Sequence, residues 1–468
     1  MKHEKVDRFL EYTGETSSSR SRKKLTIDLP FLKVTSDPLN VFLILLASAG
    51  ILYMAVKIEI FQFWAEFLRS TTLLRLATYP LIASAVIIFS GIIFRTIIWV
   101  RYRPMTEAPG EKIDWPTVSV IMPALNEEKL ISRSIDSIFE ADYPADKIEV
   151  ICINDGSTDG TLGHMLRARE KYGKRLTVID FKRNLGKRKA FYSGLKKSTG
   201  EIVLTMDTDS KIGRGALRNI VLPLVREPET GCVAGRVAVL NEKENLLTRM
   251  LAIRYAISFD FGRAYQSVYG AVFCCPGALT AYRRTLLMSF IHEWLNQRFL
   301  NAPCRHGEDR ALTTLVLRSG HMVRYQSNAL VYTRVPTQVG EMNRMYLRWT
   351  RSYLRESVIF AGFMFLPYRK KNRVLPVLDF IFLNILHPFH LFSLALIVYS
   401  FYISPLFIVR HMAFLVVAAF LLSLYYLRTQ RSVAFLYGIP YALMTAFILW
   451  WIVPVAALTI RDQSWMTR

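Results

Sequence analysis

Two aspartates, Asp207 and Asp209, directly follow the apolar residues 202–206. An apolar run of this length predicts a buried strand, and α/β folds bind their ligands at the carboxyl edge of a parallel sheet. Two carboxylates at that edge, together with phosphate oxygens, are ligands that Mg²⁺ or Mn²⁺ accepts. The pair therefore predicts a site for a divalent cation and a phosphate group. A loop with two solvated acids is the alternative.

A second acid and a basic turn are expected at the same edge. Asp155 comes just after the strand expected at residues 149–153, so it should lie beside the first pair, where it can accept hydrogen bonds from a base or a ribose. Residues 184–189 form a glycine turn with three cations, among them Lys187. Such a turn predicts a phosphate contact, and a solvated basic loop is the alternative.

Residues 115–335 alternate strand-like and helix-like segments, which predicts an α/β domain with a mainly parallel sheet. The segments expected to form strands are residues 118–122, 149–153, 176–180 and 202–206, and those expected to form helices include residues 127–139 and 190–198.

Long apolar stretches flank this domain. A bilayer core is crossed by about 20 apolar residues in a helix. On this basis residues 39–100 are expected to hold two transmembrane helices, and residues 380–460 about three. The basic head, residues 1–38, is expected to be partly disordered. The domain is thus predicted to be inserted between transmembrane helices.

Charge and cysteine content narrow the class of protein. The head is basic, and so is the segment that begins with Arg101 and Arg103. Both segments are therefore expected on the cytoplasmic side of the cell (inner) membrane, in a multi-pass protein. The net charge of +23 suits contact with anionic membrane lipids and phosphates. Nucleic-acid binding would also suit that charge, but no recognised nucleic-acid motif accompanies it. None of the five cysteines forms a CxxC pair, so neither a disulfide framework nor a zinc site is indicated.

The ordered motifs of the chain resemble those of an inverting family-2 glycosyltransferase with a GT-A fold. The motifs are VSVIMPALNEE (118–128), INDGSTDGT (153–161), NLGKRKA (184–190), MDTDS (206–210), GAVFCCPGALTAYRR (270–284), HGEDRALT (306–313) and SYLRESVI (352–359). The last three resemble segments of the chitooligosaccharide and hyaluronan synthases.

The resemblance implies a role for individual residues. It implies a nucleotide-sugar site bordered by Ala124, Asn126, Glu127, Asp155, Lys187, Asp207 and Arg348, with Asp155 at the uracil. Asp207 and Asp209 would hold Mg²⁺ or Mn²⁺, and Asp309, beside Glu308, would be the general base. Trp349, Cys275 and Arg283 would contact the acceptor. For Glu308 and Asp309 a helix-capping acid pair is the alternative.

The chain departs from this subgroup in one motif. The subgroup carries Gln-x-x-Arg-Trp after the catalytic domain, whereas this chain has Met345 before Arg348 and Trp349. Methionine cannot replace the hydrogen bonds of an amide. Arginines at helical spacing predict amphipathic interface helices within residues 338–372, lying along the inner membrane surface.

Three functions remain as hypotheses. The first is a processive transferase that uses UDP-N-acetylglucosamine, with or without UDP-glucuronate, to build and export a chitin-like or hyaluronan-like polysaccharide. The second adds a single sugar to a membrane lipid, which Met345 favours. The third is a transporter or scaffold that only binds a nucleotide. The motifs leave the oligomeric state open.

Overall fold

The computed structural model describes residues 38–57, 72–385, 402 and 407–462. Most of the basic head, the connector at 58–71 and part of the apolar stretch after residue 380 lie outside these ranges. Predictions that fall on those segments therefore stay predictions.

A mixed, mostly parallel sheet forms the centre of the described structure. Its strand order is β3-β2-β1-β4-β7-β6-β10-β5, in which β7 and β5 run antiparallel to their neighbours. The strands are β1 (Val118–Ala124), β2 (Ile148–Asp155), β3 (Leu176–Phe181), β4 (Ile202–Thr205), β5 (Ser210–Ile212), β6 (Thr230–Val239), β7 (Thr280–Arg283) and β10 (Met322–Thr333). All four predicted strands are present, and the predicted α/β class is confirmed.

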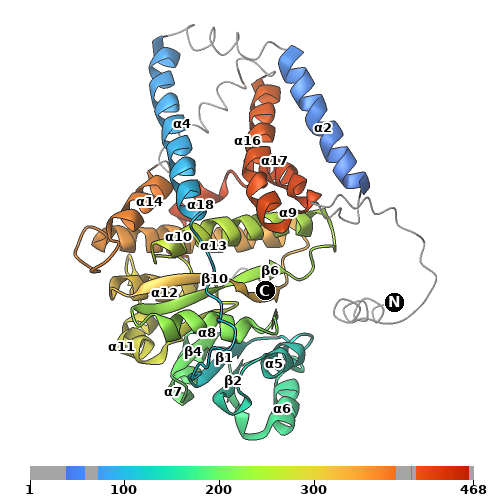
Figure 1. Cartoon of the computed structure of the whole chain (residues 1–468). Helices are drawn as coiled ribbons and strands as arrows, with labels where there is room; N and C mark the ends of the chain where they lie inside the picture. The colour runs from blue at the N-terminus through green and yellow to red at the C-terminus, as the bar shows by residue number, and fades with distance from the viewer. Residues whose placement is uncertain (1–37, 58–71, 386–401, 403–406, 463–468) are drawn as a thin grey trace, which may run out of the picture.

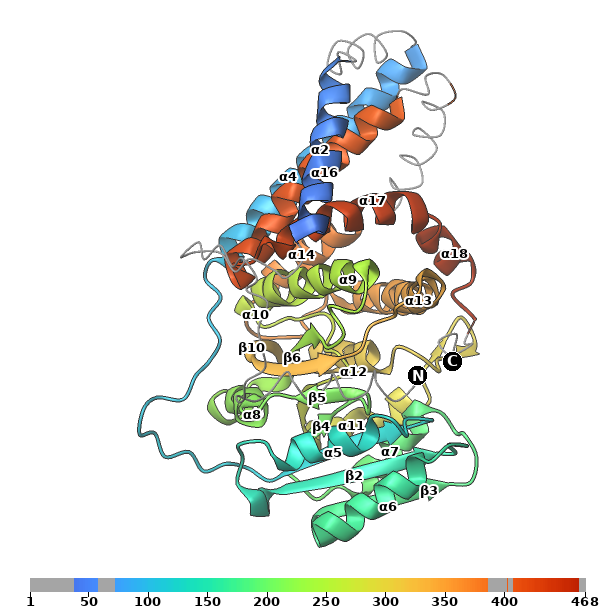
Figure 2. The same cartoon turned by 90° about the vertical axis from the view of Figure 1, so that its right-hand side faces the viewer.

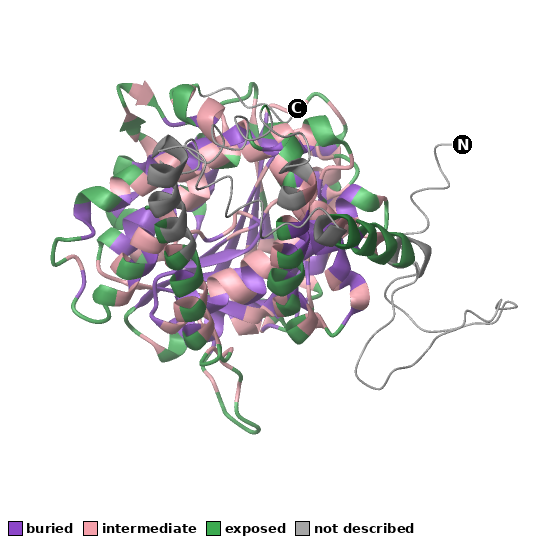
Figure 3. Ribbon diagram, turned by 90° about the horizontal axis from the view of Figure 1, so that it is seen from above, coloured by how far each residue is buried: buried purple, intermediate pink, exposed green. Residues whose placement is uncertain are grey.

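The inner strands form because their side chains are apolar on both faces. Val120, Ile121, Val150 and Ile151 are at most 1% exposed, which is the pattern of a parallel sheet covered by helices on both sides. Figure 3 shows the buried strands in purple through the centre of the molecule. The covering helices are α5 (Ile131–Phe139), α6 (Thr161–Tyr172), α7 (Lys187–Lys197), α8 (Ala216–Arg226), α11 (Arg284–Leu295) and α12 (Glu308–Arg318).

The helix expected at residues 127–139 begins only at Ile131. Asn126 has a positive φ of 57°, and its backbone N–H donates to the Ser157 hydroxyl. This left-handed conformation turns the chain at the end of β1 and so delays the start of the helix.

A layer of helices lies between the sheet and the upright helices (Figures 1 and 2). It contains α9 (Leu246–Ala256), the π-helix η4 (Ile257–Arg263), α10 (Ala264–Val268) and α13 (Val339–Phe363). The upright helices are α2 (Pro38–Lys57), α4 (Thr72–Trp99) and α16 (Phe407–Gln430). Shorter helices, α14 (Val374–Asn384), α17 (Gly438–Ile448) and α18 (Ile452–Leu458), complete this side.

The expected arginine face of α13 is only partly at a surface. Arg351 and Arg355 are 3% and 1% exposed and contact the protein interior. The prediction that this arginine stripe lies along a membrane surface is therefore wrong for these two residues, because the loop before α12 and the segment after α18 cover them.

A buried aspartate joins the sheet, the helical layer and an upright helix. The carboxylate of Asp260 in η4 accepts hydrogen bonds from Arg236 of β6 (2.9 Å), Tyr325 of β10 (3.1 Å) and Gln430 of α16 (2.8 Å). Its carbonyl oxygen accepts one from the Trp99 indole at 2.6 Å. Hydrogen-bonded buried charges of this kind fix the relative positions of the elements that share them.

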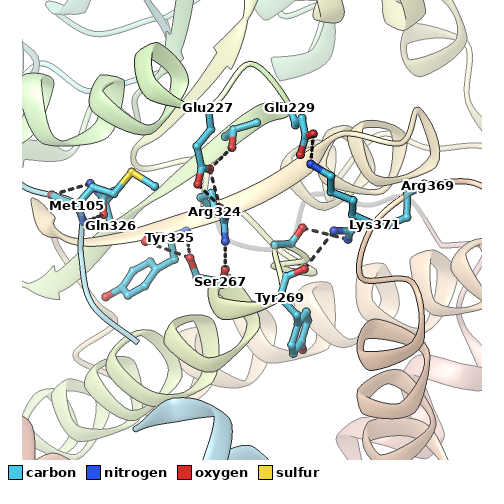
Figure 4. A network of polar contacts seen from close by, with 12 residues as sticks. Met105, Glu227, Glu229, Ser267, Tyr269, Arg324, Tyr325, Gln326, Arg369 and Lys371 are labelled. Carbon is cyan, nitrogen blue, oxygen red and sulfur yellow. Dashed lines mark hydrogen bonds and ion pairs between the residues drawn. The ribbon is translucent and has the colours of Figure 1, made fainter. Parts of the chain in front are cut away.

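A second polar network holds the amino end of β10 (Figure 4). Arg324 pairs with Glu227 and donates to the Ser267 carbonyl. Lys371, in the segment after α13, pairs with Glu229 at 2.7 Å. This network lies at the amino end of β10, whereas Thr333 at its carboxyl end lines the cavity described below.

The described residues include one helical segment long and apolar enough to cross a membrane, Met412–Gln430. The bent pair Val433–Ile448 and Ile452–Leu458, with 47° between its helices, would count as a second if it were one broken span. The apolar segments Phe42–Met54, Val86–Trp99 and Val374–Asn384 are shorter. The expectation of two spans before residue 101 and three after residue 380 is not supported by these described helices.

Candidate active site

A cavity of about 1900 Å³ lies between the carboxyl edge of the sheet and the helical layer. On the side of the sheet it is lined by Ala124, Asp155 and Thr333, the last residues of β1, β2 and β10, and by Asp207 and Asp209, which follow β4. Its roof includes residues of α9, η4 and α13. The strand ends therefore bring together the acids that the sequence separates by about 50 positions, as the parallel arrangement requires.

Both acids of the pair, Asp207 and Asp209, line this cavity. The hydroxyls of Ser210 and Thr333 donate to Asp209 Oδ1 at 3.2 and 3.3 Å. Burial, reinforced by the neighbouring charge of Asp207, raises the pKa of Asp209 to about 6. Two carboxylates whose charges disfavour each other are a donor set that a divalent cation would stabilise.

The donor set fits a cation shared with a substrate better than a closed metal centre. Among the described residues no group of three or more His, Cys, Asp or Glu side chains could hold a metal ion. Mg²⁺ binds through one or two carboxylates together with substrate phosphates and water. Asp207 and Asp209 satisfy that requirement.

Lys187 lies between two acids of the cavity. Its ammonium is 2.7 Å from Asp207 Oδ1 and 2.9 Å from Glu308 Oε1. Burial opposes the charge on Lys187, but the two carboxylates outweigh burial and raise its pKa. The cation predicted to contact phosphate thus lies beside the acid pair at the first turn of α7.

The predicted base lies at the first turn of α12. Asp309 accepts backbone hydrogen bonds from Gly277 at Oδ2 (3.3 Å) and from Arg310 at Oδ1 (2.7 Å). Burial, together with the charge of Glu308, raises the pKa of Asp309. Burial also disfavours the charge on Glu308, but Lys187 outweighs it and lowers the pKa of Glu308 to about 2. The two adjacent carboxyl groups therefore differ in pKa, and Glu308 is the one that stays ionised.

Asp155 holds the basic loop, residues 184–189, through hydrogen bonds. Its two carboxylate oxygens accept the backbone N–H groups of Leu185 (2.7 Å) and Gly186 (3.0 Å). Gly156, with a φ of +73°, passes so close that a Cβ atom would lie 2.5 Å from the Arg183 carbonyl carbon. Asp155 thus holds the turn that carries Lys187, in addition to lining the cavity.

For the nucleotide-sugar site that the motifs predict, replacing Asp155 by asparagine should raise the KM of that ligand about tenfold, with a smaller change in kcat, because one loop N–H would face an amide NH₂ group. Steady-state kinetics with varied donor would measure this. Asp114→Asn is the matched control, since Asp114 is 97% exposed and pairs with Lys147. An unchanged donor KM in Asp155→Asn would contradict the role.

The other predicted nucleotide contacts divide into two groups. Ala124 and Glu127 line the cavity. Asn126 is not among the lining residues, and its side-chain oxygen accepts the Thr158 N–H at 2.9 Å. Asn126 therefore shapes the turn after β1 and is removed from the proposed contact residues.

Two predicted acceptor residues point away from the cavity. Cys275 is fully buried, and its sulfur lies 3.3 Å from that of Cys232, whereas the neighbouring Cys274 lines the cavity. Arg283 donates to backbone carbonyls of Thr230 and Leu224 near the end of α8. Arg283 therefore stabilises the fold at the amino end of β4, away from the acid pair that follows β4. Neither predicted residue lines the cavity, and Cys274, which was not predicted, lines it in place of Cys275.

Helix α13 brings Met345, Arg348 and Trp349 to the cavity. Trp349 is 41% exposed, and its ring lies 6.1 Å from that of Tyr255 and 5.7 Å from that of Tyr346. The cavity continues toward α4 and α14 along rings that the sequence did not reveal, namely Phe261, Tyr265, Phe273, Phe360 and Phe380. These rings come from distant elements, so no local motif could have identified them.

Comparison with known proteins identifies the family of the chain. The model of glycosyl transferase family 2 matches residues 119–290. N-acetylglucosaminyltransferases of Mesorhizobium japonicum and Azorhizobium caulinodans are 33% and 30% identical over 259 and 292 residues, which are 55% and 61% of this chain and 60% and 71% of theirs. That of Rhizobium meliloti is 34% identical over 252 residues, 54% of this chain and 59% of its own.

A solved mannosyltransferase of Pyrobaculum calidifontis, in complex with GDP-Man and Mn²⁺, has the same fold. It is 23% identical, with a TM-score of 0.54, over 78% of this chain and 97% of its own. Fold and relatives together identify the family of the chain. The chain belongs to glycosyl transferase family 2. It spans about 60% of the length of the first three relatives that it matches.

Proposed function

We propose that the protein is an inverting β-glycosyltransferase that transfers N-acetylglucosamine from UDP-N-acetylglucosamine to a saccharide acceptor. The observation that carries the proposal is that Asp207, Asp209 and Asp309 line one cavity beside Lys187. The relatives named N-acetylglucosaminyltransferase support the choice of sugar.

In this reaction Asp309 is the general base. The attacking acceptor hydroxyl gives its proton to the Asp309 carboxylate while its oxygen bonds to the anomeric carbon. The bond between that carbon and the diphosphate oxygen breaks on the opposite side, so the α-linkage of the donor becomes β. Burial, which raises the pKa of Asp309, makes this carboxylate a stronger base than an exposed aspartate.

The leaving UDP diphosphate is bound at the acid pair and the basic loop. A divalent cation, Mg²⁺ or Mn²⁺, held by Asp207 and Asp209 would neutralise part of its negative charge. Lys187 adds a fixed positive charge within 3 Å of Asp207, and Arg348 of α13 lines the cavity on the side of the helical layer. The loop held by Asp155 keeps Lys187 in place.

The acceptor lies on the aromatic side of the cavity, beginning at Trp349. Aromatic faces and polar side chains are suited to sugar rings, and the wall from Trp349 to Phe380 also contains Gln266 and Asn384. This length of wall favours a growing chain over a single sugar, and it supports processive synthesis with passage toward the upright helices. Exposed apolar side chains on those helices, such as Phe42, Ile93 and Phe414, support attachment to the inner membrane with the sheet in the cytoplasm.

Transfer of one sugar to a lipid acceptor is the second candidate. It is favoured by Met345, which lines the cavity where the related synthases carry a glutamine. Sizing the product made from radiolabelled donor separates the candidates, since only the first yields long chains.

The proposal is tested by screening UDP sugars for UDP release from the full chain in detergent, with Mg²⁺ or Mn²⁺ present. We expect UDP-N-acetylglucosamine to give the highest rate, and a linkage-specific β-hydrolase to digest the product. A requirement for added UDP-glucuronate would indicate a hyaluronan-like product. Absence of UDP release with every nucleotide sugar would contradict the proposal and favour a transporter or scaffold.

A further inference from the structure

The segment after α18, residues 459–462, crosses from the upright side of the molecule to the loop that precedes α12. We name this segment the strap. Its Thr459 hydroxyl accepts hydrogen bonds from Arg351 Nε and Nη2 at 3.1 and 2.8 Å. Its Asp462 carboxylate is 3.0 Å from Arg351 Nη2. Both contacts converge on an arginine of α13 that is only 3% exposed.

The strap also contacts the loop that joins His306 to Asp309, which we name the catalytic loop. The backbone oxygen of Asp462 lies 3.2 Å from His306 Nε2, and a carbonyl oxygen can only accept. Nε2 therefore carries the proton and donates it to the strap. Burial lowers the pKa of His306 to about 4, so the ring is neutral near pH 7. His306 is fully buried and comes three residues before Asp309.

The loop between His306 and Asp309 has little freedom of its own. Arg355 Nη2 donates to the His306 carbonyl at 2.8 Å, and Gly307 adopts a φ of +70° directly against Ser352 and Arg355. The loop is thus held by α13 on one side and by the strap on the other. Arg351 and Arg355 lie one helical turn apart on α13, so movement of the strap would be passed to the loop through α13 as well as through His306.

We propose that the strap is a positioning element for the base, holding Asp309 at the acceptor through His306 and Arg351. This inference rests on the proposed function, because it assigns residues that act on the same base. The polar contacts described above join the strap to α13 and to the loop before α12. The preceding helix α18 places Ile452 and Ala456 in one apolar cluster with Met345 and Leu347 of α13. The side of the molecule that contains the upright helices is thereby connected to Asp309.

The test uses the full chain with Thr459→Val, Asp462→Asn and the two combined. Valine keeps the shape of threonine but cannot accept from Arg351, and asparagine removes the charge opposite it. We expect kcat for sugar transfer to fall about tenfold or more in the combined variant, because small displacements of a catalytic group are costly. The donor KM and the Kd for UDP should stay within about twofold, since the nucleotide side of the cavity is untouched.

Glu229→Gln is the matched control. It removes the ion pair with Lys371 at 2.7 Å, drawn in Figure 4, on the opposite end of the sheet. We expect its kcat and KM to equal those of the unmodified chain. The melting temperature and UDP binding of each variant report whether the fold is retained, and Thr459→Val alone supplies the mildest change.

The results separate this inference from the proposed function. Absence of UDP release by the unmodified chain contradicts the proposed function. An active unmodified chain whose combined variant keeps full kcat overturns the strap proposal, and so does a variant in which donor KM rises while kcat is unchanged. A fall in kcat that Glu229→Gln reproduces would also overturn it, because the effect would then be general destabilisation.

Discussion

Asp309→Asn is expected to lower kcat for sugar transfer by about 10²–10⁴-fold while UDP still binds with nearly its original affinity. Asparagine has the shape of aspartate, and its one oxygen can still accept the 2.7 Å hydrogen bond from the Arg310 N–H. It cannot take the proton of the acceptor hydroxyl. The proposed UDP site lies at the strand ends, whereas Asp309 belongs to α12, so UDP binding should survive.

The pH profile provides a second measurement on the same variant. Transfer requires the unprotonated carboxylate, so kcat should fall as the pH is lowered through the pKa of Asp309. Burial and Glu308 raise that pKa, so the fall should occur at a higher pH than for an exposed aspartate. The residual activity of Asp309→Asn should lack this acid limb. Asp142→Asn, at a side chain 56% exposed, is the control. Full activity in Asp309→Asn would refute the assignment of the base.

Gly307→Ala is expected to have the second largest effect. A Cβ at this position would overlap the Ser352 hydroxyl and would lie 2.6 Å from Ser352 Cβ and 2.8 Å from Arg355 Nη2. Its left-handed φ of +70° adds about 1 kcal/mol or more of strain for a residue with a side chain. The loop must therefore move, and it carries Glu308 and Asp309. We expect a loss of several degrees in melting temperature and a fall in kcat of about 10²-fold.

Gly110→Ala separates the effect of backbone strain from that of steric overlap with neighbouring side chains. Gly110 has a similar φ of +79°, but a Cβ there would have nothing within 4 Å. This variant should lose only the stability cost of the backbone conformation and should keep kcat. Combining Gly307→Ala with Ser352→Gly removes part of the overlap and should recover part of the activity. Equal behaviour of Gly307→Ala and Gly110→Ala in thermal unfolding and kinetics would contradict the close packing of the loop.

The sequence could predict the strands and the acids that follow them because both depend on short stretches of chain. Residues 150–153 and 202–204 are continuously apolar, so they had to be covered on both faces, and the acids that follow them had to meet at one edge. The start of α5 was missed because the local turn at Asn126, held by Ser157, overrides the helical pattern.

The parts of the site that depend on long-range packing could not be predicted. Arginine spacing on α13 identified one face of the helix but not what covers it, and Arg351 and Arg355 proved to be buried under distant segments. Cys274 and Cys275 are adjacent in a shared motif, yet only the first lines the cavity. Which neighbour turns inward depends on Cys232 of β6, which lies 43 positions away in the chain.

The Asp260 junction has a mechanical consequence. Because one carboxylate is shared by two strands and α16, the sheet and α16 are joined by direct polar contacts. A tilt of α16 imposed by its surroundings would therefore turn the sheet with it, and would not be absorbed by a flexible hinge. In the proposed bilayer setting, the thickness of the lipid would then set the angle at which the catalytic pocket faces the saccharide.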